Sequence, residues 1–497
     1  MMKLFIPLVI LQLLSLSTTA RGVDSPGDSA AVNVFYSKMQ QDIVWLTPGK
    51  KNNLQVLAGF FRQAPYLGLE ERDYQAQFIY AIATDFPDTF PSSAMIAADR
   101  QITMKALHFF CDVAYGPVNN VLVRYNGLGT LTDRYSAMPG LLAASLQSDS
   151  FELFLQRIEP ADTAYAKLKQ AFACFYDALT DTGFTETPVI SLKADTTNAA
   201  LMKRLQQLGI ADSTAAGGLR DGIIRAQEMF NVLNDGVLRS GFLHELNISF
   251  TVRQRELKDG LNQVRWLNAY QPHTMIVVNV PSTDLELFVD NKPVLYSRVI
   301  TGKKSTPTPT LASRITEVVL YPYWMVPYRI ATRELLPHIK RDRHYLDDNQ
   351  FEVLDRKGRI TDPAGINWQS LSTNNFPYVI RQNTGCDNSL GIIKLNFYSP
   401  FTVYLHDTPG KSLFMLKQRF FSHGCIRVED AVMLSRLLLD NASAAMLDTL
   451  IKEGPRSDQK PVVIPIRSTV LVFVVYNVAW ADPAGKVRFY EDVYKKY

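Results

Sequence analysis

The run Ser-His-Gly-Cys-Ile-Arg at residues 422–427 decides how the C-terminal part of this 497-residue chain is interpreted. The chain has only four cysteines and seven histidines, so its composition gives a chance expectation of roughly 0.003 His-Gly-Cys tripeptides. A thiol needs a neighbouring base or positive charge to become a nucleophile at neutral pH. Cys425 has two candidate bases, His423 beside it and His406 upstream. The run therefore predicts a nucleophilic cysteine, and we favour this over the alternative of a buried, inert cysteine with two core histidines.

The local pattern around Cys425 predicts how the reactive groups are presented. Alternate residues of an extended strand share a face, so His423, Cys425 and Arg427 are expected to project together. Asp430 is a suitable N-cap for the helical apolar spacing that follows it. We therefore expect a helix N-terminus close to Cys425, where its dipole stabilises a thiolate. Gly424 is expected to let backbone N–H groups approach a substrate oxygen, as an oxyanion hole requires.

These residues resemble the motif of the L,D-transpeptidases, the cysteine enzymes that cross-link bacterial peptidoglycan. In that family an upstream histidine precedes Ser-His-Gly-Cys-(Ile/Val)-Arg. The resemblance to the large periplasmic members is most specific over residues 270–480. The further positions that carry it are Gly302, Pro307, Pro309, Pro322, Trp324, Pro327, 388–391, Lys394, Asn396 and 405–409.

The resemblance also implies roles for individual residues. Cys425 is the nucleophile, His406 is the base that orients it, and His423 is a secondary partner. Arg427 orders the loop or holds a substrate carboxylate, although a purely structural ion pair is left open. The residues assigned to substrate binding or loop ordering are Arg427, Ser422, Gly424 and Trp324.

The resemblance implies the following reaction. Cys425 attacks the carbonyl of the third residue, meso-diaminopimelate, in a tetrapeptide stem, and the terminal D-Ala leaves. An amine of a neighbouring stem then resolves the thioester and links two diaminopimelates, and such a thiol is also expected to react with carbapenems. Two alternatives stay open, an L,D-carboxypeptidase-type hydrolase on the same thioester path and a non-catalytic cell-wall-binding scaffold.

Composition and the N-terminus indicate an exported globular protein. Hydrophobic residues make up 47% and charged residues 20% of the chain, which are ordinary globular values. The formal charge of +4 is small for this length, so no nucleic-acid partner is expected. Residues 1–20 have a basic start, a short apolar core and small residues before Ala20, as in a cleaved secretory signal. We expect a periplasmic protein that meets the membrane only through this transient segment, with a retained anchor as the alternative.

The remaining cysteines suggest no second reactive site. Without Cys425, the residues Cys111, Cys174 and Cys386 allow at most one intrachain disulfide. Cys111 and Cys174 lie in helix-like segments and are predicted to be buried rather than bridged. The chain has no Cys-x-x-Cys or His-Glu-x-x-His spacing, so neither a metal site nor a cofactor is expected.

We predict an α+β chain with its helical part first. The predicted regions are a signal peptide (1–20), a helical scaffold (21–190), a peptidoglycan-binding-like helical module (198–247) and a β-rich catalytic domain (270–497), with a capping insertion at about 327–388. Asn231 stands where that module often has Gln, so a mere helical spacer is nearly as well supported.

Two expectations concern the catalytic domain. The turn Asp-Asn-Lys at 290–292 between apolar β-patterned segments predicts a hairpin, and the apolar run 470–480 predicts a buried strand.

The resemblance implies that the insertion covers the active site, and the polar stretch 355–365 is expected to be its mobile part. A surface excursion without a role is equally compatible with its sequence.

Overall fold

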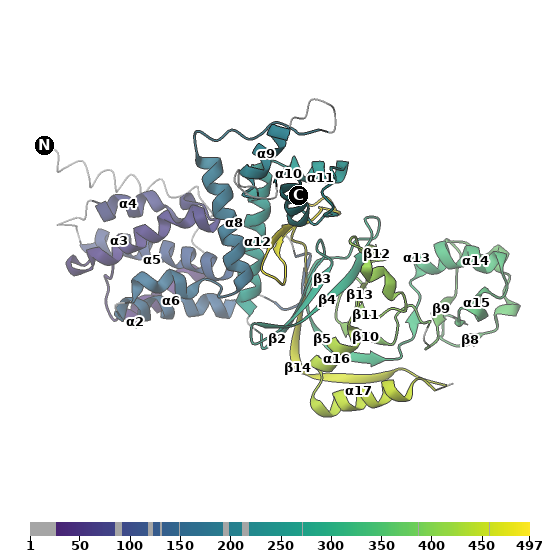
Figure 1. Cartoon of the computed structure of the whole chain (residues 1–497). Coiled ribbons are helices and arrows are strands. Elements are labelled where there is room, and N and C mark those ends of the chain that lie inside the picture. Colours follow the sequence, from purple (N-terminus) through teal and green to yellow (C-terminus); the bar gives the residue numbers. More distant parts are fainter. Residues whose placement is uncertain are drawn as a thin grey trace.

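The structure is a computed structural model that describes residues 26–84, 92–117, 123–129, 132–148, 150–191, 198–210, 218–270, 272–385, 387–456 and 458–497. The predicted signal peptide and Cys386 lie outside these residues. Helices dominate the first half and strands the second, which confirms the predicted α+β class (Figure 1). Within the described ranges, no helix has both the length and the apolar character needed to cross a membrane.

The N-terminal part is a bundle of amphipathic helices. Its helices are α2 (Pro26–Met39), α3 (Lys51–Arg62), α4 (Ala76–Thr84), α5 (Ser92–Tyr115), α6 (Thr132–Gln147), α7 (Phe154–Ile158) and α8 (Thr163–Thr180). In α3 the buried residues Leu54, Leu57, Ala58 and Phe61 recur at helical spacing, so one stripe of the helix joins a shared aromatic-rich core. Hydrophobic burial along such stripes holds the bundle together.

Two of the predicted buried cysteines differ in exposure. Cys111 in α5 is buried, but Cys174 in α8 is exposed, and neither forms a disulfide. The prediction of a buried thiol is therefore wrong for Cys174. In α8 the buried side chains are Tyr165, Leu168, Phe172 and Phe175, and Cys174 lies outside that stripe.

A small helical module follows and is tied to a long helix. Its helices are α9 (Asn198–Gln207), α10 (Gly218–Met229) and α11 (Ser240–Leu246), and the long helix is α12 (Phe250–Tyr270). Arg253 of α12 is buried and pairs with Glu245 and Glu256, each at 2.8 Å. A buried guanidinium is stable only with such partners, so this cluster fixes the module against α12.

The C-terminal part is a mixed sheet that closes on itself. Its strands are β1 (Tyr125–Asn126), β2 (Thr274–Asn279), β3 (Asp284–Val289), β4 (Lys292–Gly302), β5 (Leu311–Leu320), β10 (Ile393–Phe397), β11 (Leu405–His406), β12 (Phe420–Ser422), β13 (Ile426–Val428) and β14 (Val462–Val475). The order is β1-β5-β10-β11-β13-β4-β3-β2-β14, β12 pairs with β4, and β14 also pairs with β5. This last pairing closes the sheet into a barrel and removes free strand edges. Two helices, α16 (Ala431–Leu438) and α17 (Asn441–Glu453), lie beside it (Figure 1).

Both sequence expectations for these strands are confirmed. Asp290 and Asn291 have φ of 49° and 61°, the left-handed values that a tight β3–β4 hairpin requires. In β14, Val472 and Val474 face the barrel core, whereas Leu471 and Phe473 pack toward the helices. Because both faces of β14 are covered here, the run from Val470 to Val475 is continuously apolar rather than alternating. The buried stretch continues through a short break into β15 (Ala479–Ala481), which pairs with β16 (Val487–Phe489).

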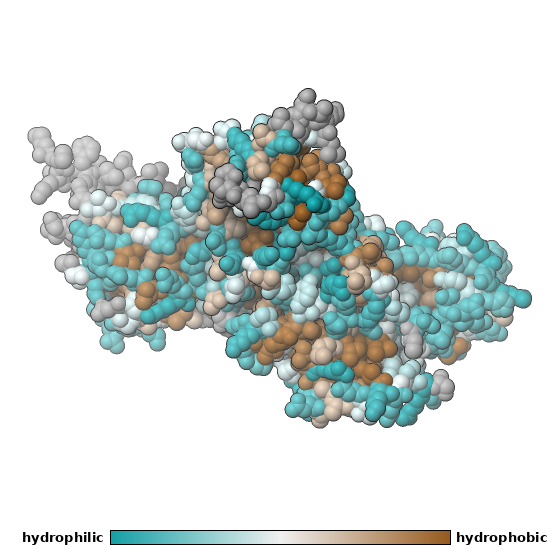
Figure 2. Space-filling view, viewed as in Figure 1, coloured by the Kyte–Doolittle hydropathy of each residue, from teal (hydrophilic) through white to brown (hydrophobic). Residues whose placement is uncertain are grey.

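The insertion between β5 and β10 is a folded unit with its own core. Its elements are β6 (Trp324–Met325), α13 (Tyr328–Ile330), the π-turn η5 (Ala331–Leu335), α14 (Leu336–Arg341), α15 (Tyr345–Asp348), β7 (Phe351–Leu354), β8 (Ile360–Thr361) and β9 (Val379–Gln382). The sheet order is β6-β9-β7-β8, and residues such as Ile330, Ile339 and Val353 form a separate apolar cluster. The insertion projects to one side of the barrel and is largely hydrophilic on the face seen in Figure 2.

Candidate active site

Cys425 lies at a sharp bend between two strands. The chain bends at residues 423–425, after β12 and before β13, and Gly424 has φ of 115°, a value that side chains disfavour. The Ser422 hydroxyl accepts the Gly424 N–H at 3.1 Å and donates to the Cys425 carbonyl at 2.5 Å, which closes the bend. The expectation of one continuous strand through Cys425 is therefore wrong.

One further expectation about this loop is corrected, and another stays a prediction. The Gly424 N–H is engaged by Ser422 and its carbonyl accepts from Thr308 Oγ1 at 2.9 Å, so its own N–H is not free; that Gly424 lets other backbone N–H groups approach a substrate oxygen stays a prediction. Helix α16 begins at Ala431, after β13, so its N-terminus does not adjoin the thiol. The helix dipole falls off within a turn and contributes little at Cys425.

His406 is held inside the sheet. It lies on β11, opposite Arg427 of β13 and Lys394 of β10, and is buried. Its Nδ1 lies 2.5 Å from the carbonyl oxygen of Asp407, an atom that can only accept. Nδ1 therefore carries the hydrogen, and Nε2 is left unprotonated to act as a base.

The environment of His406 keeps the imidazole neutral. Burial, and after it the positive charge of Arg427, lowers the pKa of His406 to about 3, while the Asp407 and Leu390 carbonyls oppose the shift. The imidazole is therefore neutral at physiological pH, with Nε2 free of a proton, and the same low pKa makes it a weaker base than an ordinary histidine.

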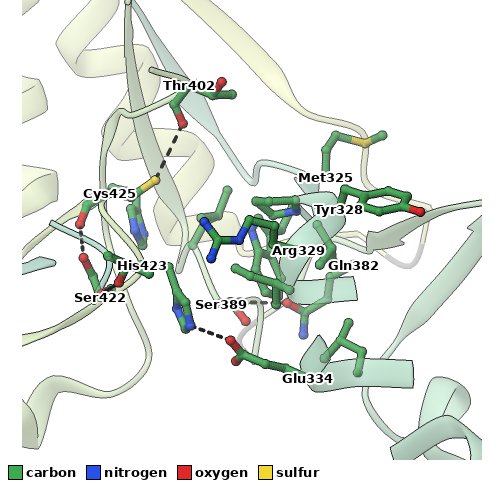
Figure 3. Close-up of a pocket in the computed structure, with 18 of the residues that line it drawn as sticks. Met325, Tyr328, Arg329, Glu334, Gln382, Ser389, Thr402, Ser422, His423 and Cys425 are labelled. Atoms are coloured by element: carbon green, nitrogen blue, oxygen red, sulfur yellow. Dashed lines mark hydrogen bonds and ion pairs between the residues drawn. The ribbon is translucent and has the colours of Figure 1, made fainter. Parts of the chain in front are cut away.

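The thiol of Cys425 is also held in its neutral form. Burial raises its pKa, and hydrogen bonds from the N–H and hydroxyl of Tyr404, together with the charges of Lys394 and Arg427, act in the opposite direction. The thiol itself points to the Thr402 carbonyl at 4.0 Å (Figure 3). Both the thiol of Cys425 and the imidazole of His406 are therefore in their neutral forms in this cavity.

Tyr404 links the thiol to the insertion. Burial raises the pKa of the Tyr404 hydroxyl; Cys425 raises this pKa further, and the Trp324 side chain at the start of β6 lowers it. Its ring meets that of His406 edge-on at 5.7 Å, and Lys394 Nζ lies 4.3 Å from the ring centre. The sequence analysis gave Tyr404 no role. Strand alternation with His406, two residues later, is the signal that indicates a shared face.

His423 faces the insertion. Its Nε2 lies 2.7 Å from Glu334 Oε1 of η5 and 3.3 Å from Lys303 Nζ (Figure 3). The sequence offered no sign of Glu334, because this contact joins segments that only the tertiary fold brings together. The contact ties the nucleophile's loop to the insertion.

A cavity of about 1060 Å³ contains most of the predicted site. It lies between the barrel and the insertion, and the predicted site residues that line it are Cys425, His406, His423, Arg427, Ser422 and Trp324; Gly424 does not. Arg427 has no ion pair with another described residue, so the structural ion pair considered for it is not present in this part of the chain.

The charged residues in the cavity lining are mainly basic. Its cationic side chains are Lys303, Arg329, Arg333 and Arg427, and its carboxylates are Glu334 and Asp387. Residues 355–365 are not in the lining, so the expected mobile part does not border the site; residues 324–335 form that wall instead. The insertion therefore contributes directly to the cavity, and the excursion without a role does not fit.

Two parts of the chain match known family models. Residues 273–464 match the model of the L,D-transpeptidase catalytic domain (YkuD). This part of the chain is an L,D-transpeptidase catalytic domain. Residues 30–172 match a scaffold domain model, in the region of the helical bundle.

One relative of this region carries the same family name. A Haemophilus influenzae protein named "Putative L,D-transpeptidase" is 39% identical over 222 residues. That match covers 45% of this chain and 44% of the relative, so less than half of the relative is compared.

Solved structures of the family show only a low overall similarity. An L,D-transpeptidase from Mycobacterium smegmatis is 15% identical, with 41% of this chain and 58% of that one covered and a TM-score of 0.19. An L,D-transpeptidase in complex with imipenem is 14% identical, with 41% and 59% covered and a TM-score of 0.17. TM-scores this low carry no weight for the assignment, which rests on the family model.

Proposed function

We propose that this protein is a peptidoglycan L,D-transpeptidase that joins diaminopimelate residues of neighbouring stem peptides through a thioester on Cys425. The observation that supports this most is that the Cys425 thiol and the neutral imidazole of His406 line the same cavity, whose charged lining residues are mainly cationic. Stem peptides carry several carboxylates, and a basic cavity favours such ligands. Export to the periplasm belongs to the proposal, and cell fractionation of the full-length protein checks it.

Cys425, His406 and Arg427 have separate roles in the first half-reaction. Cys425 Sγ attacks the carbonyl of the third stem residue while its proton passes to His406 Nε2. When the C–N bond breaks, the imidazolium returns that proton to the departing D-Ala amine, and a thioester remains. Arg427, which has no ion pair with another described residue and lines the same cavity as the thiol, holds a carboxylate of the donor peptide.

In the second half-reaction an amine of another stem attacks the thioester. The new C–N bond forms as the C–S bond breaks, and His406 passes the amine proton to the departing sulfur. Water competes with the amine, so the insertion wall beside Cys425 favours transfer by limiting the access of water.

Product analysis tests this function against its two rivals. Purified protein is incubated with disaccharide-tetrapeptide muropeptides, and the products are separated and weighed by mass spectrometry. We expect a cross-linked dimer with loss of one D-Ala. Shortened monomer alone would identify a carboxypeptidase, and unchanged substrate that stays bound would identify a wall-binding scaffold.

The low pKa of His406 leads to a pH prediction. The base must be unprotonated, and with a pKa of about 3 it is unprotonated throughout the neutral range. We therefore expect the rate of Cys425 acylation by imipenem, followed by intact mass from about pH 5 to about pH 8, to show no acidic limb centred near 6.5, the ordinary value for histidine. The same profile measured on His423→Gln removes any contribution of the second histidine. A limb near 6.5 that persists in His423→Gln would show that His406 titrates normally.

A further inference from the structure

Two arginines of the insertion lie in the wall of the cavity that contains Cys425. Arg329 on α13 and Arg333 on η5 both line the cavity and are exposed to solvent. In Figure 3 the Arg329 side chain extends toward the space between Cys425 and His423. Neither guanidinium has an ion pair or hydrogen bond with any other described residue. The pair is therefore free to bind a ligand.

The fold of the insertion forces these side chains into the cavity. Ile330, Ala331 and Leu335 are buried in the insertion's own core, so Arg329 and Arg333 lie on the opposite face of the helix. Pro337 has no N–H to donate to the carbonyl four residues earlier, and the preceding turn is π-helical, with the Leu336 N–H bonded to the Ala331 carbonyl. Such π-turns are frequent at functional sites.

Glu334, the carboxylate next to Arg333 in the sequence, is already engaged by another residue. Glu334 pairs with His423, and Lys303 lies against the same imidazole. Arg427 extends from the barrel side, on β13. Arg329 and Arg333 thus form a separate positive patch in the cavity wall. Guanidinium groups match the planar geometry of a carboxylate and bind it through paired hydrogen bonds.

We propose that Arg329 and Arg333 form a subsite for the carboxylate attached to the carbon that bears the reacting nitrogen. This inference rests on the proposed transpeptidation. In the first half-reaction the leaving D-Ala carries such a carboxylate beside its amine. In the second, the attacking amine of diaminopimelate has a carboxylate on the same carbon.

Microscopic reversibility makes this one subsite rather than two. The incoming nitrogen bonds to the carbonyl carbon from which the first nitrogen departed, so both nitrogens occupy the same position beside Cys425. Their neighbouring carboxylates then reach the same wall. The guanidinium groups also disfavour a protonated amine nearby, which increases the share of free amine able to attack.

The experiment follows the transfer of the acyl group from Cys425 to D-alanine. When D-alanine is the acceptor, its free amine forms a C–N bond with the thioester carbonyl, the C–S bond breaks, and the amine proton reaches sulfur through His406. The product is the original tetrapeptide. Isotope-labelled D-alanine therefore reports the transfer step directly as label in the tetrapeptide.

The experiment compares wild type, Arg329→Gln, Arg333→Gln and the matched control Arg356→Gln, which removes an exposed arginine of the insertion that does not line the cavity. The acceptors are labelled D-alanine and D-alaninamide, compared at equal concentrations of free amine. Loss of one charged hydrogen-bonding partner costs roughly 10- to 100-fold. In wild type and Arg356→Gln we expect the transfer rate to fall by this factor when D-alaninamide replaces D-alanine. In Arg329→Gln and Arg333→Gln we expect the rate with D-alanine itself to be lower than in wild type by this factor.

The decisive readout is non-additivity. In each single cavity variant the penalty for amidation of the acceptor is expected to be smaller than in wild type. In the double variant Arg329→Gln/Arg333→Gln it is expected to fall below about threefold, because both partners of the carboxylate are then gone. A full amide penalty in the double variant would overturn the subsite while leaving transpeptidation intact. Absence of labelled tetrapeptide with wild type would instead overturn the proposed transfer function, and this inference with it.

Discussion

Replacement of Cys425 by alanine is expected to abolish both cross-linked dimer and the mass increase on incubation with imipenem. The thioester needs the sulfur, and no other described cysteine lines the cavity with a histidine beside it. Intact-mass spectrometry measures the acylation, and separation of the muropeptides measures the dimer.

Alanine at each of the other cysteines provides the control. Cys111→Ala, Cys174→Ala and Cys386→Ala are expected to retain acylation and dimer formation. Cys111 and Cys174 lie in the helical bundle, on α5 and α8. Imipenem that still adds covalently to the Cys425→Ala protein would falsify the assignment of the nucleophile.

Replacement of His406 by alanine is expected to slow acylation of Cys425 by roughly 10²- to 10⁴-fold, the usual contribution of a positioned acid–base group. The thiol pKa is raised by burial, so little thiolate exists without a base to accept the proton. Single-turnover acylation by imipenem gives the rate, and a thermal melt verifies that the variant is folded.

His423→Ala is the matched comparison for His406→Ala. The His423 ring nitrogen is engaged with Glu334 of the insertion, so its removal loosens the contact between loop and insertion without removing the base. We expect a much smaller loss of acylation rate than for His406→Ala. Equal losses, or a larger loss for His423→Ala, would reverse the roles of the two histidines.

Short-range patterns were predicted well. The β3–β4 hairpin follows from Asp290 and Asn291, which tolerate left-handed backbone, and the two-sided burial of β14 follows from its unbroken apolar sequence. The prediction failed around Cys425, because alternation alone ignores the effect of Gly424. Its positive φ, with the Ser422 hydroxyl bridging the bend, breaks what alternation predicts to be one strand.

Distant contacts were not predictable in the same way. The Glu334–His423 pair and the Tyr404 link between Cys425 and Trp324 join segments far apart in the chain. The place of the cavity wall was also misjudged, since residues 355–365 are more polar but residues 324–335 border the thiol.

The sequence by itself determined the α+β class and was sufficient to predict the nucleophile and its candidate bases, because these depend on residue type, local periodicity and a motif too improbable to arise by chance. Only the tertiary structure decided that His406 is buried and neutral, what His423 contacts and which arginines reach the cavity. A pKa depends on burial and on nearby charges, and both are set by strands and loops from distant parts of the chain. The chemistry was therefore present in the sequence, and the fold determined how it is arranged.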